Sequence, residues 1–154
     1  MISRALLGIL LLVTAFLTAG CALLPGASPP SELSEVQRHA ATWAAKGPAS
    51  YSMTVQRSCF CPPESSGPFT VVVRDGAVAS VTFDGKPIAV GGLRGVPITI
   101  PAVFDLLAAQ PKTAKVSIGW DEQLGFPLSF SVDPIPNAVD DEFAITVSDF
   151  VAQP

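Results

Sequence analysis

Two cysteines separated by one residue, in the run Cys59-Phe60-Cys61-Pro62-Pro63, are the first candidates for chemistry. In an extended strand, the Cβ atoms of residues two apart lie about 6.5–7 Å apart, whereas a disulfide needs about 3.5–4.5 Å. The strand must therefore end or buckle for Cys59 and Cys61 to form the structural disulfide that we expect. The alternatives are reduced thiols, a metal site and a thiol-redox role. The Cys-x-x-Cys spacing of thioredoxin-like proteins is absent.

Acidic residues concentrate near the C-terminus. Seven acidic and no basic residues lie in the segment 116–154, whereas eight basic and six acidic residues lie in 21–115. Carboxylates that converge at one end of a sheet can bind Ca²⁺ through oxygen ligands, although the EF-hand spacing is absent. The alternative is that these acids only solvate turns and strand ends. The candidate metal ligands are Asp121, Asp133, Asp140, Asp141 and Glu142.

The sequence offers little for catalysis or for nucleic-acid binding. Its one histidine, His39, is expected on the solvated side of a helix, off the apolar face. No G-x-S-x-G or H-E-x-x-H motif occurs, and the glycines at 91, 92 and 95 are not followed by the lysine of a phosphate-binding loop. A net charge of −4 gives no basic footprint for a nucleic acid. We therefore expect a chain that is not an enzyme, uses no cofactor and binds no nucleic acid.

The first 21 residues have the pattern of an export and lipidation signal. Arg4 precedes an apolar stretch over residues 5–16, and small residues lead up to Cys21. This pattern resembles the lipobox of bacterial lipoproteins, which implies cleavage before Cys21 and a lipid on its sulfur. Thr18 departs from that pattern, because leucine is usual three positions before the cysteine. An uncleaved transmembrane anchor over residues 5–24 is the main alternative, and free secretion is a second one.

The resulting organisation is a signal peptide (1–20), a lipidated tether (21–30) and a single domain (31–154). The tether is uncharged and holds three prolines, which favours an extended spacer. With Cys21 lipidated, the other two cysteines form a self-contained pair. The expected location is the extracytoplasmic side of the cell membrane or cell envelope, with the membrane as partner through the lipid.

Hydrophobic periodicity predicts an α+β domain. Apolar residues recur at helical spacing between Ser31, an expected N-cap, and the stop signal Gly47-Pro48, and a second helix follows the expected cap Thr99. Period-two alternation predicts strands, and Asp75-Gly76 predicts a hairpin turn with positive φ. The predicted strands are 51–59, 69–73, 77–83, 115–120, 127–133 and 143–150. The expected order is α-β-β-β-α-β-β-β, an antiparallel sheet of about six strands with two helices on one face.

Several runs, taken in order, resemble a family of bacterial exported and lipid-anchored domains of unknown function. The most specific are Cys59-Phe60-Cys61 and Asn137-Ala138-Val139-Asp140-Asp141-Glu142, and the resemblance covers about residues 35–151. It implies a small α+β envelope domain and carries no catalytic residues. The expected function is a non-enzymatic binding or accessory module for an envelope protein, polymer or small ligand. The alternatives are a metal-binding lipoprotein, using the acidic loops or Cys59 and Cys61, and a thiol-redox protein.

Intact-mass spectrometry of the native protein tests both cysteine predictions together. We expect a chain that begins at Cys21, carries the added mass of acyl groups, and lacks two hydrogens through the Cys59–Cys61 bond. An unprocessed precursor in the cytosol with an unmodified N-terminus would contradict the export prediction.

Overall fold

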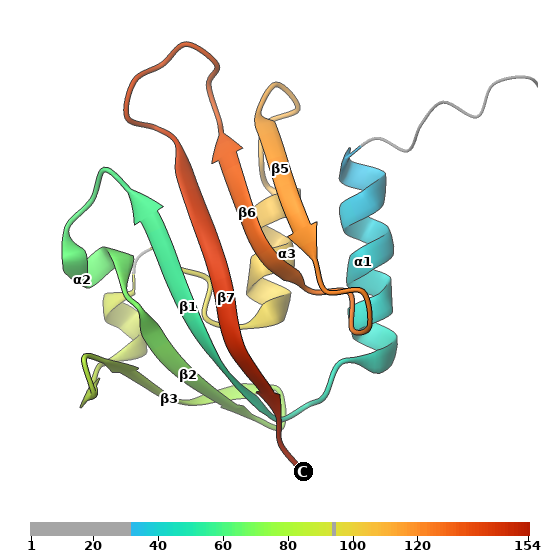
Figure 1. Cartoon of the computed structure of the whole chain (residues 1–154), viewed down its shortest axis with the longest axis vertical. Coiled ribbons are helices and arrows are strands. Elements are labelled where there is room, and N and C mark those ends of the chain that lie inside the picture. Colours follow the sequence, from blue (N-terminus) through green and yellow to red (C-terminus); the bar gives the residue numbers. More distant parts are fainter. Residues whose placement is uncertain (1–31, 94) are drawn as a thin grey trace, which may run out of the picture.

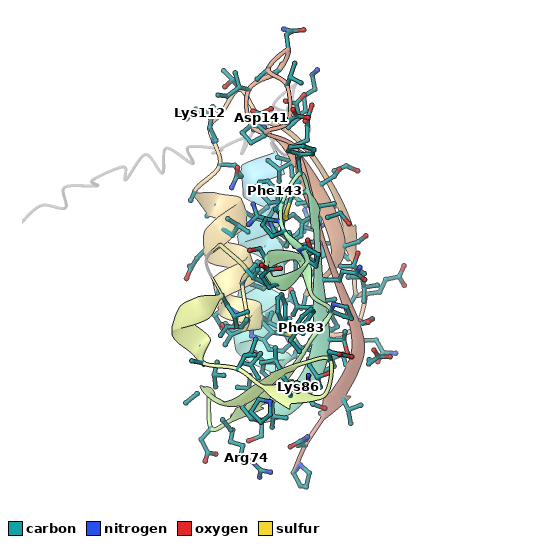
Figure 2. The ribbon with its side chains drawn as sticks, turned by 90° about the vertical axis from the view of Figure 1, so that its left-hand side faces the viewer. Arg74, Phe83, Lys86, Lys112, Asp141 and Phe143 are labelled. Atoms are coloured by element: carbon teal, nitrogen blue, oxygen red, sulfur yellow. A yellow bond between two sulfur atoms is a disulfide. The ribbon has the colours of Figure 1, made fainter. Side chains whose placement is uncertain are left out.

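An antiparallel sheet with helices on one face makes up the part of the chain that the computed structural model describes, residues 32–93 and 95–154. Helices α1 (Glu32–Lys46) and α3 (Ile100–Ala108) lie behind the sheet in Figure 1 and to one side of it in Figure 2. The fold is therefore α+β, as expected. The predicted signal peptide, tether, lipidation residue Cys21 and helix cap Ser31 lie outside the described residues.

The sheet has seven strands in the described ranges, and the predictions of about six strands and of the element order were wrong in detail. The strands are β1 (Tyr51–Cys59), β2 (Phe69–Arg74), β3 (Ala77–Phe83), β4 (Lys86–Pro87), β5 (Lys115–Trp120), β6 (Pro127–Asp133) and β7 (Phe143–Ala152). The prediction omitted β4, the short helix α2 (Pro63–Ser66) and the 3-10 turn η1 (Val90–Gly92). These elements have two, four and three residues, too few to show a period.

Strand β1 lies at the centre of the sheet, whose order is β4-β3-β2-β1-β7-β6-β5. One edge of β1 pairs with β2, which follows it closely in the chain, and the other pairs with β7, the last strand. In the second pairing, Tyr51 lies opposite Ala152 and Cys59 lies opposite Phe143. The start of the domain is thereby joined to its end.

Local signals in the sequence explain the turns and the second helix. Asp75 and Gly76 have φ values of 50° and 77°, which confirms the positive φ expected for the hairpin between β2 and β3. At the start of α3, the Thr99 hydroxyl accepts a hydrogen bond from the Ala102 N–H at 3.2 Å. The predicted N-cap is therefore present, and Pro101 occupies the first turn, where no N–H is required.

The core lies between the helices and the covered face of the sheet. Alternate residues of the central strands are fully buried there, including Val55, Val71 and Ile145, each 0% exposed. Trp43 of α1 lies among aromatic rings of the sheet, with ring centroids 5.6 Å from Tyr51 and 5.9 Å from Phe150. This aromatic group joins the C-terminal half of α1 to the sheet.

Tyr51 also joins the sheet to α3. Its phenol oxygen accepts a hydrogen bond from the Ile100 N–H at 3.0 Å, so a strand side chain supplies a partner for the first N–H of the helix. Burial raises the pKa of the Tyr51 phenol above its ordinary value of 10.0, and the hydrogen bond from Ile100 opposes this shift. The neutral phenol is therefore the form that the fold favours.

The chain has a single tyrosine, so phenolate absorbance reports on Tyr51 alone. We expect half-ionisation above pH 10.0 in the folded protein and near 10.0 after denaturation. Because the unfolded chain loses this proton first, the contribution of Tyr51 to stability should be complete below pH 10.0 and decline as the pH rises further. Tyr51→Phe should remove this decline and, by leaving the Ile100 N–H without its partner, cost about 1–3 kcal/mol at neutral pH in urea unfolding. A folded-state phenol that ionises at or below pH 10.0 would contradict this account.

Candidate functional site

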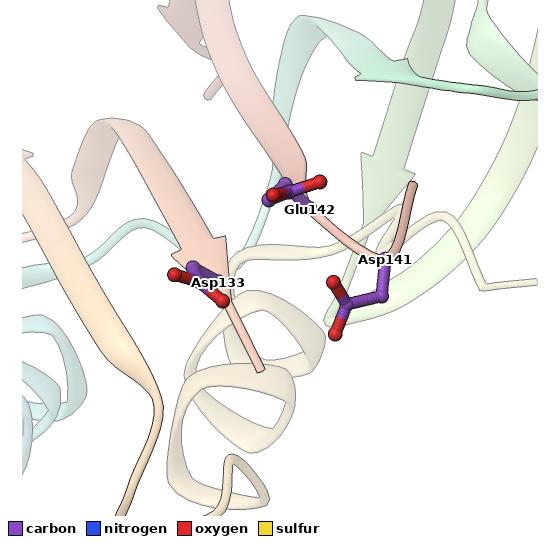
Figure 3. Close-up of side chains that lie close together, drawn as sticks. All are labelled: Asp133, Asp141 and Glu142. Atoms are coloured by element: carbon purple, nitrogen blue, oxygen red, sulfur yellow. The ribbon is translucent and has the colours of Figure 1, made fainter. Parts of the chain in front are cut away.

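Three carboxylates meet where β6 ends and β7 begins. Asp133 is the last residue of β6, and Asp141 and Glu142 immediately precede β7. Antiparallel pairing of the two strands brings them together, and one oxygen from each residue lies within 4.8 Å of the others (Figure 3). We call Asp133, Asp141 and Glu142 the acidic cluster. The group offers the hard oxygen ligands that Ca²⁺ and Mg²⁺ prefer.

The hydrogen bonds of the cluster satisfy only some of its oxygens. Oδ2 of Asp141 accepts a hydrogen bond from the Ile135 N–H at 3.1 Å, and Oδ2 of Asp133 lies 3.6 Å from Nζ of Lys115. In the described part of the chain, the Oδ1 atoms of Asp133 and Asp141 are buried and have no hydrogen-bond partner. An unsatisfied buried carboxylate oxygen is costly, and a second carboxylate within a few ångströms adds repulsion.

The structure separates the other two candidate ligands from this cluster. Asp121 follows β5, at the opposite end of the β5–β6 hairpin, where Trp120 pairs with Pro127. Its Oδ1 accepts hydrogen bonds from the N–H groups of Gln123 and Leu124, at 3.0 and 2.6 Å, and so fixes a turn. Asp140 is exposed, has a φ of 67°, and is not one of the three residues whose oxygens converge. Asp121 therefore has the turn role that the sequence left open.

The cysteine pair lies at the same end of the sheet as the acidic cluster. Cys59 and Cys61 are at disulfide distance, with Cα atoms 5.3 Å apart. Strand β1 ends at Cys59, and the Cys61 N–H donates to the Cys59 carbonyl at 2.9 Å, which closes a three-residue turn around Phe60. The strand thus ends where the geometric argument required it to. Because Cys59 pairs with Phe143, this turn lies next to the start of β7.

An open depression of about 340 Å³ lies at this end of the sheet, on its uncovered face. It is lined by Ser58, Ser131, Val132, Asp133, Glu142, Phe143 and Ala144. The surrounding face is rich in small hydroxyl side chains that alternate with inward residues along β1, β5, β6 and β7, namely Ser52, Thr54, Ser117, Ser129, Thr146 and Ser148. Uncharged hydrogen-bonding hydroxyl groups therefore lie beside the acidic cluster.

Comparison with known proteins assigns the chain to a family. A family model described as a family of unknown function, DUF6174, matches residues 35–152. The chain belongs to DUF6174. The match covers the sheet and nearly all of α1, which confirms the resemblance to a family of unknown function. Neither the curated proteins nor the solved structures contain a match to this DUF6174 chain. Within residues 32–93 and 95–154, no helix has the length and apolar character needed to cross a membrane.

The prediction of a solvated histidine in this DUF6174 domain was wrong. His39 is half-buried, and its ring stacks on Trp120 with centroids 3.9 Å apart and an interplanar angle of 3°. Its Nδ1 atom is buried and has no hydrogen-bond partner among the residues that the structure describes. The helical pattern of α1 could not reveal this contact, because Trp120 approaches from the end of β5.

Arg57 is a further residue whose position the sequence did not assign. It occupies an inward-facing position of β1 that interrupts the series Tyr51, Met53 and Val55. The guanidinium carbon lies 5.2 Å from the centroid of the Phe143 ring, and Nη1 donates to the Gly95 carbonyl at 3.4 Å. Arg57 thus supports the start of β7 from the helix side. The sequence feature that could have identified Arg57 is the presence of a charged residue in an otherwise apolar series.

Proposed function

We propose that this chain is a lipid-anchored domain of the cell envelope, on the extracytoplasmic side, and that it binds a partner without catalysing a reaction. In this proposal, residues 1–20 direct export, Cys21 carries the lipid, and residues 21–30 tether the domain. The partner is an envelope protein, polymer or small ligand.

The pairing of Cys59 with Cys61 is the observation that carries the proposal. Disulfides persist in oxidising compartments and are rare in the cytosol. The chain has three cysteines, and this pair uses two of them. Cys21, which follows small residues and an apolar stretch, is the third. Each cysteine therefore has a role that fits export.

The open depression supports the binding part of the proposal. Its rim combines hydroxyl groups of Ser58 and Ser131 with the carboxylates of Asp133 and Glu142. These groups form hydrogen bonds with a polar ligand and attract a cationic one. His39 is not part of this lining, because it stacks on Trp120 near the other end of β5.

Labelling cells with an alkyne-bearing fatty acid tests the anchor. We expect the native chain to take up the label and sediment with membranes, and Cys21→Ser to lose the label because the acceptor sulfur is gone. The matched control is the double variant Cys59→Ser, Cys61→Ser, which should retain the label. A Cys21→Ser chain that stays in the membrane with an uncleaved N-terminus would support the transmembrane anchor over residues 5–24 instead.

A second candidate function is binding of a divalent cation by the acidic cluster. Two observations favour it. Oδ1 of Asp133 and Oδ1 of Asp141 are buried without hydrogen-bond partners in the described residues, and one oxygen from each of the three acids lies within 4.8 Å of the others. A divalent cation would satisfy these oxygens and cancel their mutual repulsion. The residues present fit Ca²⁺ in donor type, with open positions left for water.

Thermal unfolding with and without millimolar Ca²⁺ tests this second function. We expect Ca²⁺ to raise the Tm of the native chain by about 4 °C or more, which corresponds to about 1 kcal/mol for a domain of this size. Asp141→Asn should abolish the shift and, without Ca²⁺, should stabilise the fold by relieving repulsion.

The control for this experiment is Asp105→Asn, an exposed residue of α3, which should keep the full Ca²⁺ shift. Equal Ca²⁺-induced shifts of Tm in Asp141→Asn and Asp105→Asn would mean that Ca²⁺ acts by general screening of charge. No shift in the native chain would exclude the cation site.

A further inference from the structure

The most exposed large apolar side chains gather at one end of the molecule. Among the described residues, Phe60 is 87% exposed, Val139 is 83% exposed and Ile135 is 62% exposed, and these are the three highest values for large apolar residues. Single exposed apolar residues are ordinary, but a group at one end marks a surface for contact. Phe60 follows β1, and the other two lie between β6 and β7, so all three belong to the end that carries the acidic cluster.

The turn around Phe60 is built to hold this side chain outward. Cys59 and Cys61 flank it at disulfide distance, and the Cys61 N–H donates to the Cys59 carbonyl. On its far side, the Ser66 hydroxyl lies 3.2 Å from the Cys61 sulfur and donates to the Pro62 carbonyl at 3.2 Å. The aromatic ring therefore projects from a closed and supported turn rather than from a loose loop.

The N-terminal chain enters the domain at this same end. The second half of α1 packs near the end of β5 and the start of β1, through His39 on Trp120 and Trp43 on Tyr51. The first turn of α1 therefore points toward the opposite end of the sheet, where β1 ends and β7 begins (Figure 1). Figure 2 places Asp141 at this end and Arg74 at the other.

Ten residues separate Cys21 from Glu32, the first residue of α1. Fully extended, this segment spans at most about 40 Å, so a lipid on Cys21 would hold the domain close to the bilayer. We propose that the end bearing Phe60, Ile135 and Val139 is a membrane-contacting surface, with these three side chains inserted among the lipids. This inference rests on the proposed anchor at Cys21.

The charges at this end determine the kind of lipid surface that fits. The carboxylates of the acidic cluster lie there, and so do Lys112, labelled near Asp141 in Figure 2, and Lys115, which pairs with Asp133. A surface with this excess of acids is not attracted to anionic headgroups. Contact is therefore apolar and requires no anionic lipid. Each apolar side chain adds only a modest gain, but the anchor keeps the domain at a high local concentration beside the bilayer.

Site-specific photo-crosslinking in the producing bacterium tests the surface. Three full-length variants carry p-benzoylphenylalanine in place of Phe60, Val139 or Ala77. Ala77 is the exposed first residue of β3, at the opposite end from Phe60, and serves as the matched control. After irradiation, intact-mass spectrometry identifies the adduct, and fatty-acid labelling of each variant reports the anchor. We expect lipid adducts at positions 60 and 139 in several-fold higher yield than at position 77.

The other outcomes separate this inference from the anchor itself. Two outcomes in chains that carry the fatty-acid label would overturn the membrane surface and leave the anchor intact. The first is the absence of lipid adducts at positions 60 and 139, and the second is a yield of lipid adduct at position 77 equal to that at positions 60 and 139. A discrete protein adduct at position 60 in place of lipid would overturn it in favour of a protein partner. Chains without the label would overturn both proposals.

Discussion

The antiparallel pairing of β1 with β7 is the constraint on which the rest of the molecule depends. It joins residues 51–59 to residues 143–152, across nearly the whole domain, and it unites the hairpins on either side of β1 into one sheet. Strands so distant in sequence pair only with a large loss of chain entropy, and burial of apolar side chains must offset that loss. The buried residues Val55, Ile145 and Val147 on these two strands provide this burial.

The same pairing places the cysteine turn and the acidic cluster at one end of the sheet. Because Cys59 lies opposite Phe143, the cysteine turn meets the segment that carries Asp141 and Glu142. Arg57, two residues earlier, contacts the Phe143 ring and extends to Gly95, which connects this end to the loop before α3. The neighbouring hairpin of β5 and β6 then delivers Asp133 and Lys115. A change in the register of β7 would separate Asp141 and Glu142 from the cysteine turn and from Asp133.

Short-range patterns in the sequence were sufficient for most of the elements. The bounds predicted for Ala77–Phe83, Lys115–Trp120 and Pro127–Asp133 are those observed, because period-two patterning and the turn residues beside each strand mark it locally. The Lys86–Pro87 strand was missed because two residues are too few to show a period, although the Asp84-Gly85 turn that pairs it with β3 has positive φ at both positions. His39 was misplaced for a different reason, because the ring that covers it comes from residue 120, which is distant in sequence.

By itself, the sequence determined the helices, the long strands and the Asp75-Gly76 turn. It also required the first strand to end at Cys59. Each of these features depends on the chemistry of neighbouring residues. The sequence also supplied the candidate acids, without saying which of them meet. The tertiary structure decided that Asp133, Asp141 and Glu142 converge while Asp121 caps a turn at the other end. Strand direction and register fix those distances, and they are set by packing across the whole sheet.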